Sequence, residues 1–204
     1  MQQTRINLSY ERFIYNTTVL YIMMIEEWEK FKGWLTLEYF LQTNGKIHIK
    51  GLAKNLKISP RTAQFYLQLY EKSKILKKEK VGNIILYNLN ENPLVFEFKK
   101  IYSLINFMPC IENFAEKNPE INIIALYGSH AIGKDDNKSD IDLLIISQTK
   151  KLNLEPMKEL EKKSMKEVKI QIFSIGEWRN LVNKNDSFAL SVLRNHIILH
   201  GASL

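Results

Sequence analysis

The sequence contains a single cysteine, Cys110, among its 204 residues. One thiol cannot form a disulfide within the chain, and it cannot supply the several thiolates of a structural zinc site. Scaffolds that depend on disulfides are therefore excluded. One cysteine together with 29 lysines and arginines predicts a protein of the reducing cytoplasm.

Long hydrophobic runs are also missing. The most apolar early stretch, residues 13–25, is interrupted by three polar residues at 16–18 and is shorter than the ~20 residues of a membrane span. It lacks the small-residue cleavage site of a signal peptide. The sequence thus predicts no membrane contact. We expect residues 1–30 to form an N-terminal extension or helix, and Met23 and Met24 leave open a later translation start.

Positive charge is concentrated in one segment. Residues 46–100 contain 12 lysines and arginines and 4 glutamates, whereas the remaining residues carry 17 basic and 18 acidic groups. The resulting net charges, +8 and −1, predict a polyanion-binding face on that segment. A solvated, lysine-rich surface is the alternative. With 45% hydrophobic residues, the chain is long enough for two small domains that each bury a core.

The first module is predicted over residues 31–90. Its helices follow from apolar residues at helical spacing, and one of them opens with a serine and a proline in the order favoured at N-cap and N1 positions. Two strand-like runs flank a Gly-Asn turn. In order, the patterns predict a helix over residues 34–41, a short strand over 46–50, a short helix over 52–56, a helix opening at Ser59-Pro60, and a hairpin of residues 76–81 and 84–89.

This order of elements resembles the winged helix-turn-helix superfamily. The resemblance implies that the helix opening at Ser59 enters the major groove of double-stranded DNA, while lysines beside the hairpin turn neutralise phosphates. Lys74 stands where many members have a glycine, so we expect that turn to be built differently. The alternative is a module for dimerisation or protein docking. The residues expected at DNA are Ser59, Arg61, Thr62, Gln64, Gln68, Lys77, Lys78 and Lys80.

The second module, residues 119–204, contains two short motifs joined by a fixed spacing. An apolar, β-rich run ends in Gly128-Ser129, and ten residues later Asp140-Ile141-Asp142 begins another apolar run. Strand alternation places Asp140 and Asp142 on one face, about 7 Å apart, where two carboxylates can share a hard divalent cation. Gly128 allows a phosphate to approach the backbone, and Ser129 offers a hydroxyl and an amide.

The spacing of these motifs is similar to the signature of polymerase-β-like nucleotidyltransferases, in their minimal, antitoxin-type and archaeal-type form. The resemblance implies that Gly128 and Ser129 bind the phosphates of ATP or another nucleoside triphosphate, and that Asp140 and Asp142 are catalytic and ligate Mg²⁺. It also implies a protein or nucleic-acid acceptor, including a companion toxin. The predicted fold is α+β with two domains: a winged helix-turn-helix, then a mixed sheet with flanking helices.

Two features depart from that family's pattern. His130 stands where many small members have an arginine, so phosphate binding would be weaker. The third carboxylate of active members is not evident, because the run at residues 168–173 offers Lys169 and Gln171; Glu167 is expected to face the site only if a bulge shifts the strand. The alternative function is therefore a DNA-binding transcriptional regulator with a nucleotide-sensing, catalytically weak domain. A protein in which neither site functions is a third hypothesis.

Two further helical regions are predicted. Connector helices are expected over residues 91–118, beginning at Asn92-Pro93 and broken or restarted at Pro109. An apolar face on this connector makes a homodimer a hypothesis. A final helix is expected over residues 187–200, with His200 near its C-terminal end.

Overall fold

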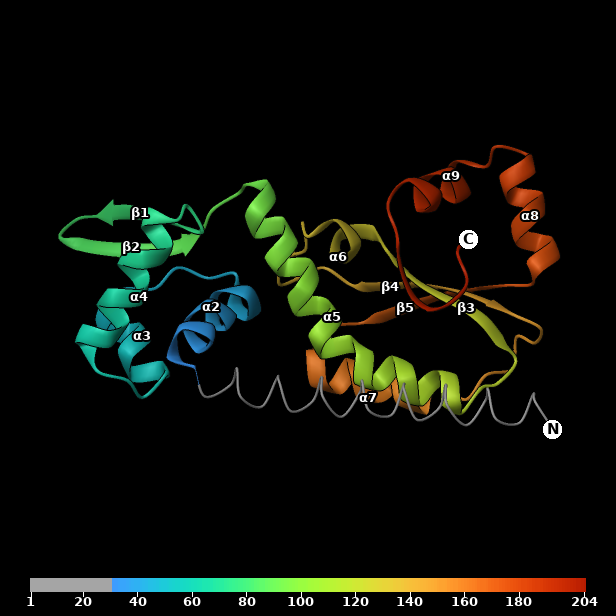
Figure 1. Ribbon diagram of the computed structural model, residues 1–204, viewed down its shortest axis with the longest axis horizontal. Helices are drawn as coiled ribbons and strands as arrows, with labels where there is room; N and C mark the ends of the chain where they lie inside the picture. Colours follow the sequence, from blue (N-terminus) through green and yellow to red (C-terminus); the bar gives the residue numbers. More distant parts are fainter. Residues whose placement is uncertain (1–30) are drawn as a thin grey trace, which may run out of the picture. The chain divides into compact units, whose positions relative to one another are not determined.

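The computed structural model describes residues 31–204. The chain divides into two compact units, one ending at Asn88 and the other beginning at Leu89 (Figure 1). The expected extension over residues 1–30, its apolar stretch and the alternative starts at Met23 and Met24 lie outside the described residues. Among the helices that the structure describes, none has the length and apolar character needed to cross a bilayer.

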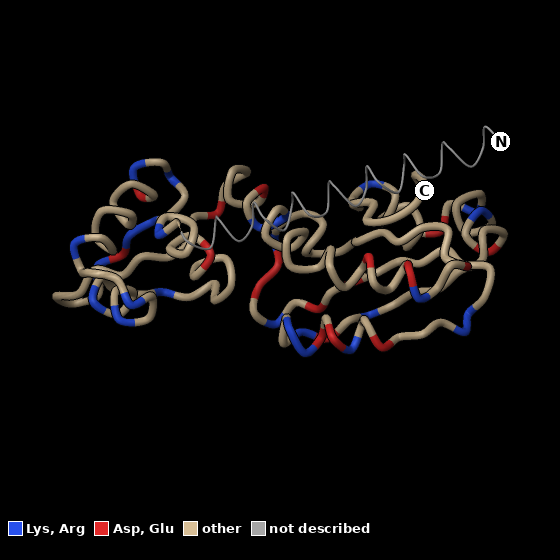
Figure 2. Tube along the Cα trace, turned by 60° about the horizontal axis from the view of Figure 1, so that its bottom comes forward, with Lys and Arg blue, Asp and Glu red and all other residues tan. Residues whose placement is uncertain are grey.

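Three helices and a two-stranded hairpin make up the described part of the first unit. Its core is built from apolar side chains of every element, including Phe40, Leu52, Leu67 and Leu76, all at most 1% exposed. Residues 31–88 hold eleven lysines and arginines against three glutamates, a charge excess visible in Figure 2. The elements are α2 (Lys32–Thr43), α3 (Ile49–Asn55), α4 (Pro60–Lys72), β1 (Leu76–Val81) and β2 (Ile84–Leu89).

The two ends of α4 follow from local sequence. At the start, the side chain of Ser59 accepts a hydrogen bond of 3.0 Å from the backbone amide of Thr62, and Pro60 occupies the first helical position. Beyond the end, Lys74 adopts a φ of 59°, the left-handed conformation that a glycine would take without strain. The turn therefore keeps a glycine-like backbone, and the expectation that it is built differently is wrong.

The strand expected over residues 46–50 is reduced to one residue. Ile47 forms an isolated antiparallel bridge with Tyr87, with N–O distances of 3.0 and 2.8 Å. Helix α3 already begins at Ile49, because backbone hydrogen bonds such as Leu52 to His48 close its first turn. The order of elements otherwise agrees with the sequence pattern, and assignment to the winged-helix superfamily stays a prediction.

A four-stranded mixed sheet forms the centre of the second unit. The strand order is β5-β4-β3-β6, with β4 parallel to β5 and β3 antiparallel to both of its neighbours. The elements are α5 (Pro93–Glu116), β3 (Ile121–Tyr127), α6 (Gly128–Ile132), β4 (Ile141–Ser147), α7 (Glu155–Ser164), β5 (Val168–Phe173), α8 (Ile175–Asn183), α9 (Ser187–Arg194) and β6 (Ile197–Gly201).

Helices cover both faces of this sheet (Figure 1). Phe114 of α5 and Leu160 of α7 pack with Leu143 and Ile145 on one face. Trp178 of α8 and Val192 of α9 pack on the other, with Leu144 and Ile146. Strand β4 is consequently apolar on both sides, which explains its continuous hydrophobic run.

Residues 91–118, expected as separate connector helices, contain one helix that belongs to the second unit. Helix α5 continues through Pro109, contrary to the expected break. The proline removes one backbone hydrogen bond. Buried side chains on both sides of it, Phe107 and Ile111 among them, fix the helix on the sheet and hold it continuous. Its contacts are with α6, α7 and β6.

The helix expected over residues 187–200 is too long. Helix α9 ends at Arg194, and β6 follows as an edge strand that pairs with β3. The β-branched residues Ile197 and Ile198 lie opposite Leu126 and Ala125, where sheet pairing outweighs the helical spacing. His200 therefore lies in a strand.

Candidate active site

Gly128 is the point where β3 passes into α6. Its φ is +71°, in the left-handed region that favours glycine. A Cβ at this position would overlap the carboxylate oxygen Oδ2 of Asp142. Both the backbone conformation and the close approach therefore require glycine, and they bring the Gly128-Ser129 turn against Asp142.

The two aspartates lie at the beginning of β4. Asp142 is opposite Tyr127 in the antiparallel register, and Asp140 precedes the strand by one residue. Burial raises the pKa of Asp142; the charge of Lys169 acts in the opposite direction, and Asp140 adds to the increase. Burial, with a contribution from Asp142, also raises the pKa of Tyr127 to about 12. The carboxylate pair thus lies at the edge of the protein interior, where charge interactions are stronger than in bulk water.

Lys169 occupies the strand position beside this pair. It is opposite Asp142 in the parallel register of β4 and β5, and its Nζ lies 2.5 Å from Oδ2 of Asp140. The hydrogen bond and charge of Asp140 raise the pKa of Lys169. The strand position opposite Asp142 holds an ammonium group paired with Asp140, and not a third carboxylate.

Neither neighbour of Lys169 supplies the missing acid. Gln171 lies opposite Leu144, further along the strand. The register of β4 and β5 shows no bulge; Glu167 precedes β5, and its carbonyl accepts a 2.8 Å hydrogen bond from the amide of Ile141. Glu167 has the same alternation parity as Lys169, but it lies outside β5, so a role for its carboxylate at the site stays a prediction.

The donor set can be tested for its fit to a divalent cation. Over residues 31–204 there is no group of three or more histidine, cysteine or acidic side chains that could hold a metal. Asp140 and Asp142 alone suit Mg²⁺, which is often held by one or two carboxylates together with water and substrate phosphates. The pair therefore fits Mg²⁺, with water or phosphate oxygens completing its coordination.

The side chain of His130 is buried, although the residue directly follows the Gly128-Ser129 turn. Its ring is 2% exposed, packs edge-on against Phe107, and places Nδ1 3.0 Å from the hydroxyl of Ser103. Burial lowers the pKa of His130 to about 4, in spite of the nearby Asp135. A buried, neutral His130 agrees with the expectation that it binds phosphate less strongly than an arginine would at this position.

Two lysines from distant elements hold the loop between α6 and β4. Lys99 of α5 donates a hydrogen bond to the backbone carbonyl of Asp135, and its Nζ lies 4.0 Å from Oδ1 of that residue. Lys166 donates to the carbonyls of Asp136 and Ser139, at 2.6 and 3.1 Å. The sequence pattern did not predict the role of either lysine, because each contacts residues about thirty positions away in the chain.

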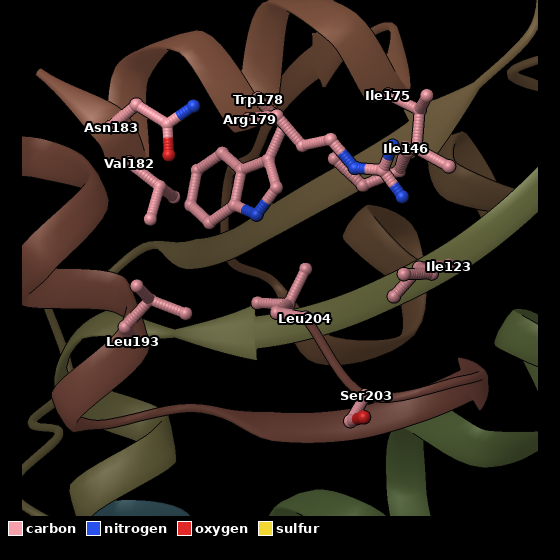
Figure 3. A pocket seen from close by; sticks show the side chains of 10 residues that line it. All are labelled: Ile123, Ile146, Ile175, Trp178, Arg179, Val182, Asn183, Leu193, Ser203 and Leu204. Carbon is pink, nitrogen blue, oxygen red and sulfur yellow. The ribbon is translucent and has the colours of Figure 1, made fainter.

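A pocket of about 260 Å³ opens at the other end of β4 (Figure 3). Trp178 and Arg179 come from α8, Ile146 from the end of β4, and Leu204 from the last residues. The lining is mainly apolar and does not include the aspartates. It offers one guanidinium but no set of phosphate ligands, so it is separate from the Gly128-Ser129 turn.

The residues expected at DNA occur on α4 and β1. Arg61, Gln64 and Gln68 are exposed on α4. The hydroxyl groups of Ser59 and Thr62 are hydrogen-bonded to each other at 2.8 Å. Ser59 is also the N-cap of α4. The lysines of β1 are also exposed: Lys77, Lys78 and Lys80.

Charge and apolar surface are mixed on this unit. Lys78 pairs with Glu71 at 3.1 Å, and Lys46 pairs with Glu79 at 2.5 Å. Phe65 on α4 is 59% exposed. An exposed aromatic suits either a thymine methyl group or a protein partner, so the surface is compatible with DNA binding and with docking.

Comparison with known proteins gives one family match. A family model described as "Polymerase beta, Nucleotidyltransferase" matches residues 110–201, a span that contains Gly128, Ser129, Asp140 and Asp142. No match is found among curated proteins.

Solved structures similar to this chain include a toxin-antitoxin and a putative nucleotidyltransferase. A toxin-antitoxin crystal structure with AMP-PNP is 20% identical, covers 47% of this chain and 74% of that chain, and has a TM-score of 0.35. A putative nucleotidyltransferase from Sulfolobus solfataricus is 18% identical, with coverages of 51% and 85% and a TM-score of 0.32. Residues 110–201 are therefore similar to a polymerase-β-type nucleotidyltransferase domain.

Proposed function

We propose that the chain is a Mg²⁺-dependent nucleotidyltransferase. It transfers a nucleoside monophosphate from ATP or another nucleoside triphosphate to a hydroxyl group of a protein or nucleic-acid acceptor in the cytoplasm. The observation that carries this proposal is the direct apposition of Gly128 and Asp142, which joins the phosphate-binding turn to the carboxylate pair. The family match over residues 110–201 supports the same reaction class.

The roles of the residues follow from their chemistry. Gly128 and Ser129 bind phosphate oxygens, and Asp140 and Asp142 hold Mg²⁺, which when bound neutralises charge on the triphosphate. The acceptor oxygen forms a bond to the α-phosphorus, the bond to the bridging oxygen breaks, and pyrophosphate and the hydroxyl proton leave. Lys166 keeps the loop before Asp140 in place through the carbonyl of Ser139.

The first unit brings the reaction to a partner. The net charge of +8 on residues 31–88 and the exposed polar face of α4 support binding of double-stranded DNA. A companion toxin as protein acceptor and a homodimer remain hypotheses. Salt-dependent binding that Arg61→Ala weakens would support a DNA partner, because each lost phosphate contact lowers the salt slope by about one unit.

One observation favours a second function. Lys169, not an acid, lies beside Asp142 and pairs with Asp140. A site without the third carboxylate lacks a base for the attacking hydroxyl. The alternative is therefore a DNA-binding regulator whose second unit senses a nucleotide with little turnover.

Label transfer distinguishes the two functions. The full chain is incubated with α-³²P-labelled nucleoside triphosphates and Mg²⁺, alone, with DNA or RNA, and with the product of the neighbouring gene. Asp142→Asn should abolish transfer, whereas Asp186→Asn should not, because Asp186 caps α9 and asparagine is an equally good N-cap. Transfer that survives Asp142→Asn contradicts the assignment of Asp142 as a metal ligand of the active site. Nucleotide binding without transfer by the wild type supports the regulator.

A further inference from the structure

A contribution to stability does not suffice to explain the contact between Lys169 and Asp140. The two side chains are 50% and 31% exposed. Ion pairs at this exposure typically contribute about 0–1 kcal/mol, since water screens them and both side chains lose freedom. The pair nevertheless lies at the carboxylates of the candidate active site, because Lys169 is opposite Asp142 in the register of β4 and β5.

The charge of the site limits the cations it can hold. Asp140, Asp142 and Lys169 together carry one negative charge. Two-metal sites hold their divalent cations about 4 Å apart, where four positive charges need several carboxylates. A carboxylate at position 169 would have made the side-chain charge −3. Lys166, which donates to the carbonyl of Ser139, adds further positive charge nearby.

The contact with Lys169 limits the carboxylate oxygens that are left for a metal ion. Oδ2 of Asp140 is taken by the ammonium group of Lys169. The other oxygen of Asp140 and the carboxylate of Asp142 remain for a divalent cation within the described part of the site.

We propose that Lys169 takes the place of the second divalent cation, so that this site binds a single metal ion. The ammonium group neutralises Asp140 permanently, and the one metal ion occupies the oxygens that Lys169 leaves. This inference rests on the proposed function for its use in nucleotidyl transfer, but the number of bound metal ions can be measured without any reaction.

The test counts Mn²⁺ bound to the full chain by electron paramagnetic resonance, without nucleotide. We expect one Mn²⁺ per chain for the wild type and two for Lys169→Glu. Lys169→Gln should still bind one ion, about tenfold more tightly or better, because a like charge is removed close to it. Asp140→Asn combined with Lys169→Glu should return the count to one. Circular dichroism verifies that each variant is folded.

A matched control distinguishes the effect of a charge change at position 169 from the effect of a change in net charge. Lys151 is an exposed lysine of the same unit, outside the site, and Lys151→Glu makes the same change in charge as Lys169→Glu. It should leave both the number and the affinity of bound ions as in the wild type. The inference is overturned if the wild type binds two ions or none, if Lys169→Glu does not gain one, or if Lys151→Glu has the same effect.

Failure of this inference and failure of the proposed function give different results. A chain that binds one Mn²⁺ but transfers no label would refute the transferase and leave the single-ion site standing. A chain that transfers label and binds two ions would refute the role of Lys169 alone.

Discussion

The backbone of Gly128 lies directly against the carboxylate of Asp142, with no space for a Cβ between them. Gly128→Ala should therefore displace Asp142 and reduce nucleotide binding and transfer at least tenfold. It should also destabilise the fold, by about 1–2 kcal/mol for the left-handed backbone alone. Isothermal titration with nucleotide and thermal unfolding measure the two effects.

Gly82 is the matched control for Gly128. Its φ is +60°, but a Cβ there would meet nothing within 4 Å. Gly82→Ala should show the backbone cost without the loss of nucleotide binding. Equal nucleotide binding by the two variants would show that the contact with Asp142 is unimportant.

Substitutions at the N-cap of α4 distinguish an effect on stability from an effect on DNA binding. Ser59→Ala removes the hydrogen bond to the amide of Thr62 and should lower the free energy of unfolding by about 1 kcal/mol. Ser59→Asn and Ser59→Asp both preserve a cap, so both should keep near-native stability. If α4 meets DNA, only Ser59→Asp should weaken binding, because it adds a negative charge beside phosphates. Fluorescence anisotropy with duplex DNA gives the answer, and indistinguishable affinities would contradict the DNA model.

The buried ring of His130 makes stability depend on pH. Its pKa is lowered from 6.5 to about 4, so between these values the unfolded chain binds a proton that the folded chain does not. Stability due to this group should fall as the pH decreases through that window, by up to about 1.4 kcal/mol per pH unit, and level off below it. Denaturant unfolding from pH 7 to pH 4 measures the slope.

His130→Asn removes the titrating group while keeping a polar atom near Ser103. The slope should flatten in this variant, whatever its absolute stability. His200→Asn, at an exposed position, should retain the wild-type slope. An unchanged slope in His130→Asn would assign the pH dependence to other groups.

Pro109 interrupts the hydrogen bonding of α5 at an exposed position. Pro109→Ala restores a donor for the carbonyl of Ile105 and should stabilise the second unit by about 1–3 kcal/mol. Pro93→Ala is the control, because proline at the first helical position costs no hydrogen bond, and it should be nearly neutral. Calorimetry shows the difference; a destabilised Pro109→Ala would mean that the proline is required for packing.

Local features were predictable because their signals lie within a few residues. The cap at Ser59-Pro60, the Gly82-Asn83 turn and the strand ending at Tyr127 follow from residue preferences that act over a few residues. Errors appeared where packing overrides such preferences. Helix α5 crosses Pro109 because its apolar face is buried, and residues 197–201 become a strand because β3 offers an unpaired edge.

The sequence by itself determined the two carboxylates, their spacing and the glycine before them, since these depend on positions along one chain segment and on strand alternation. Only the tertiary structure decided what surrounds them. It placed Lys169 against Asp140, turned His130 inward to Ser103, and used Lys99 and Lys166 to hold the intervening loop. These contacts join residues about thirty positions apart, and they depend on the register of β4 with β5 and on burial against α5, which no local pattern encodes.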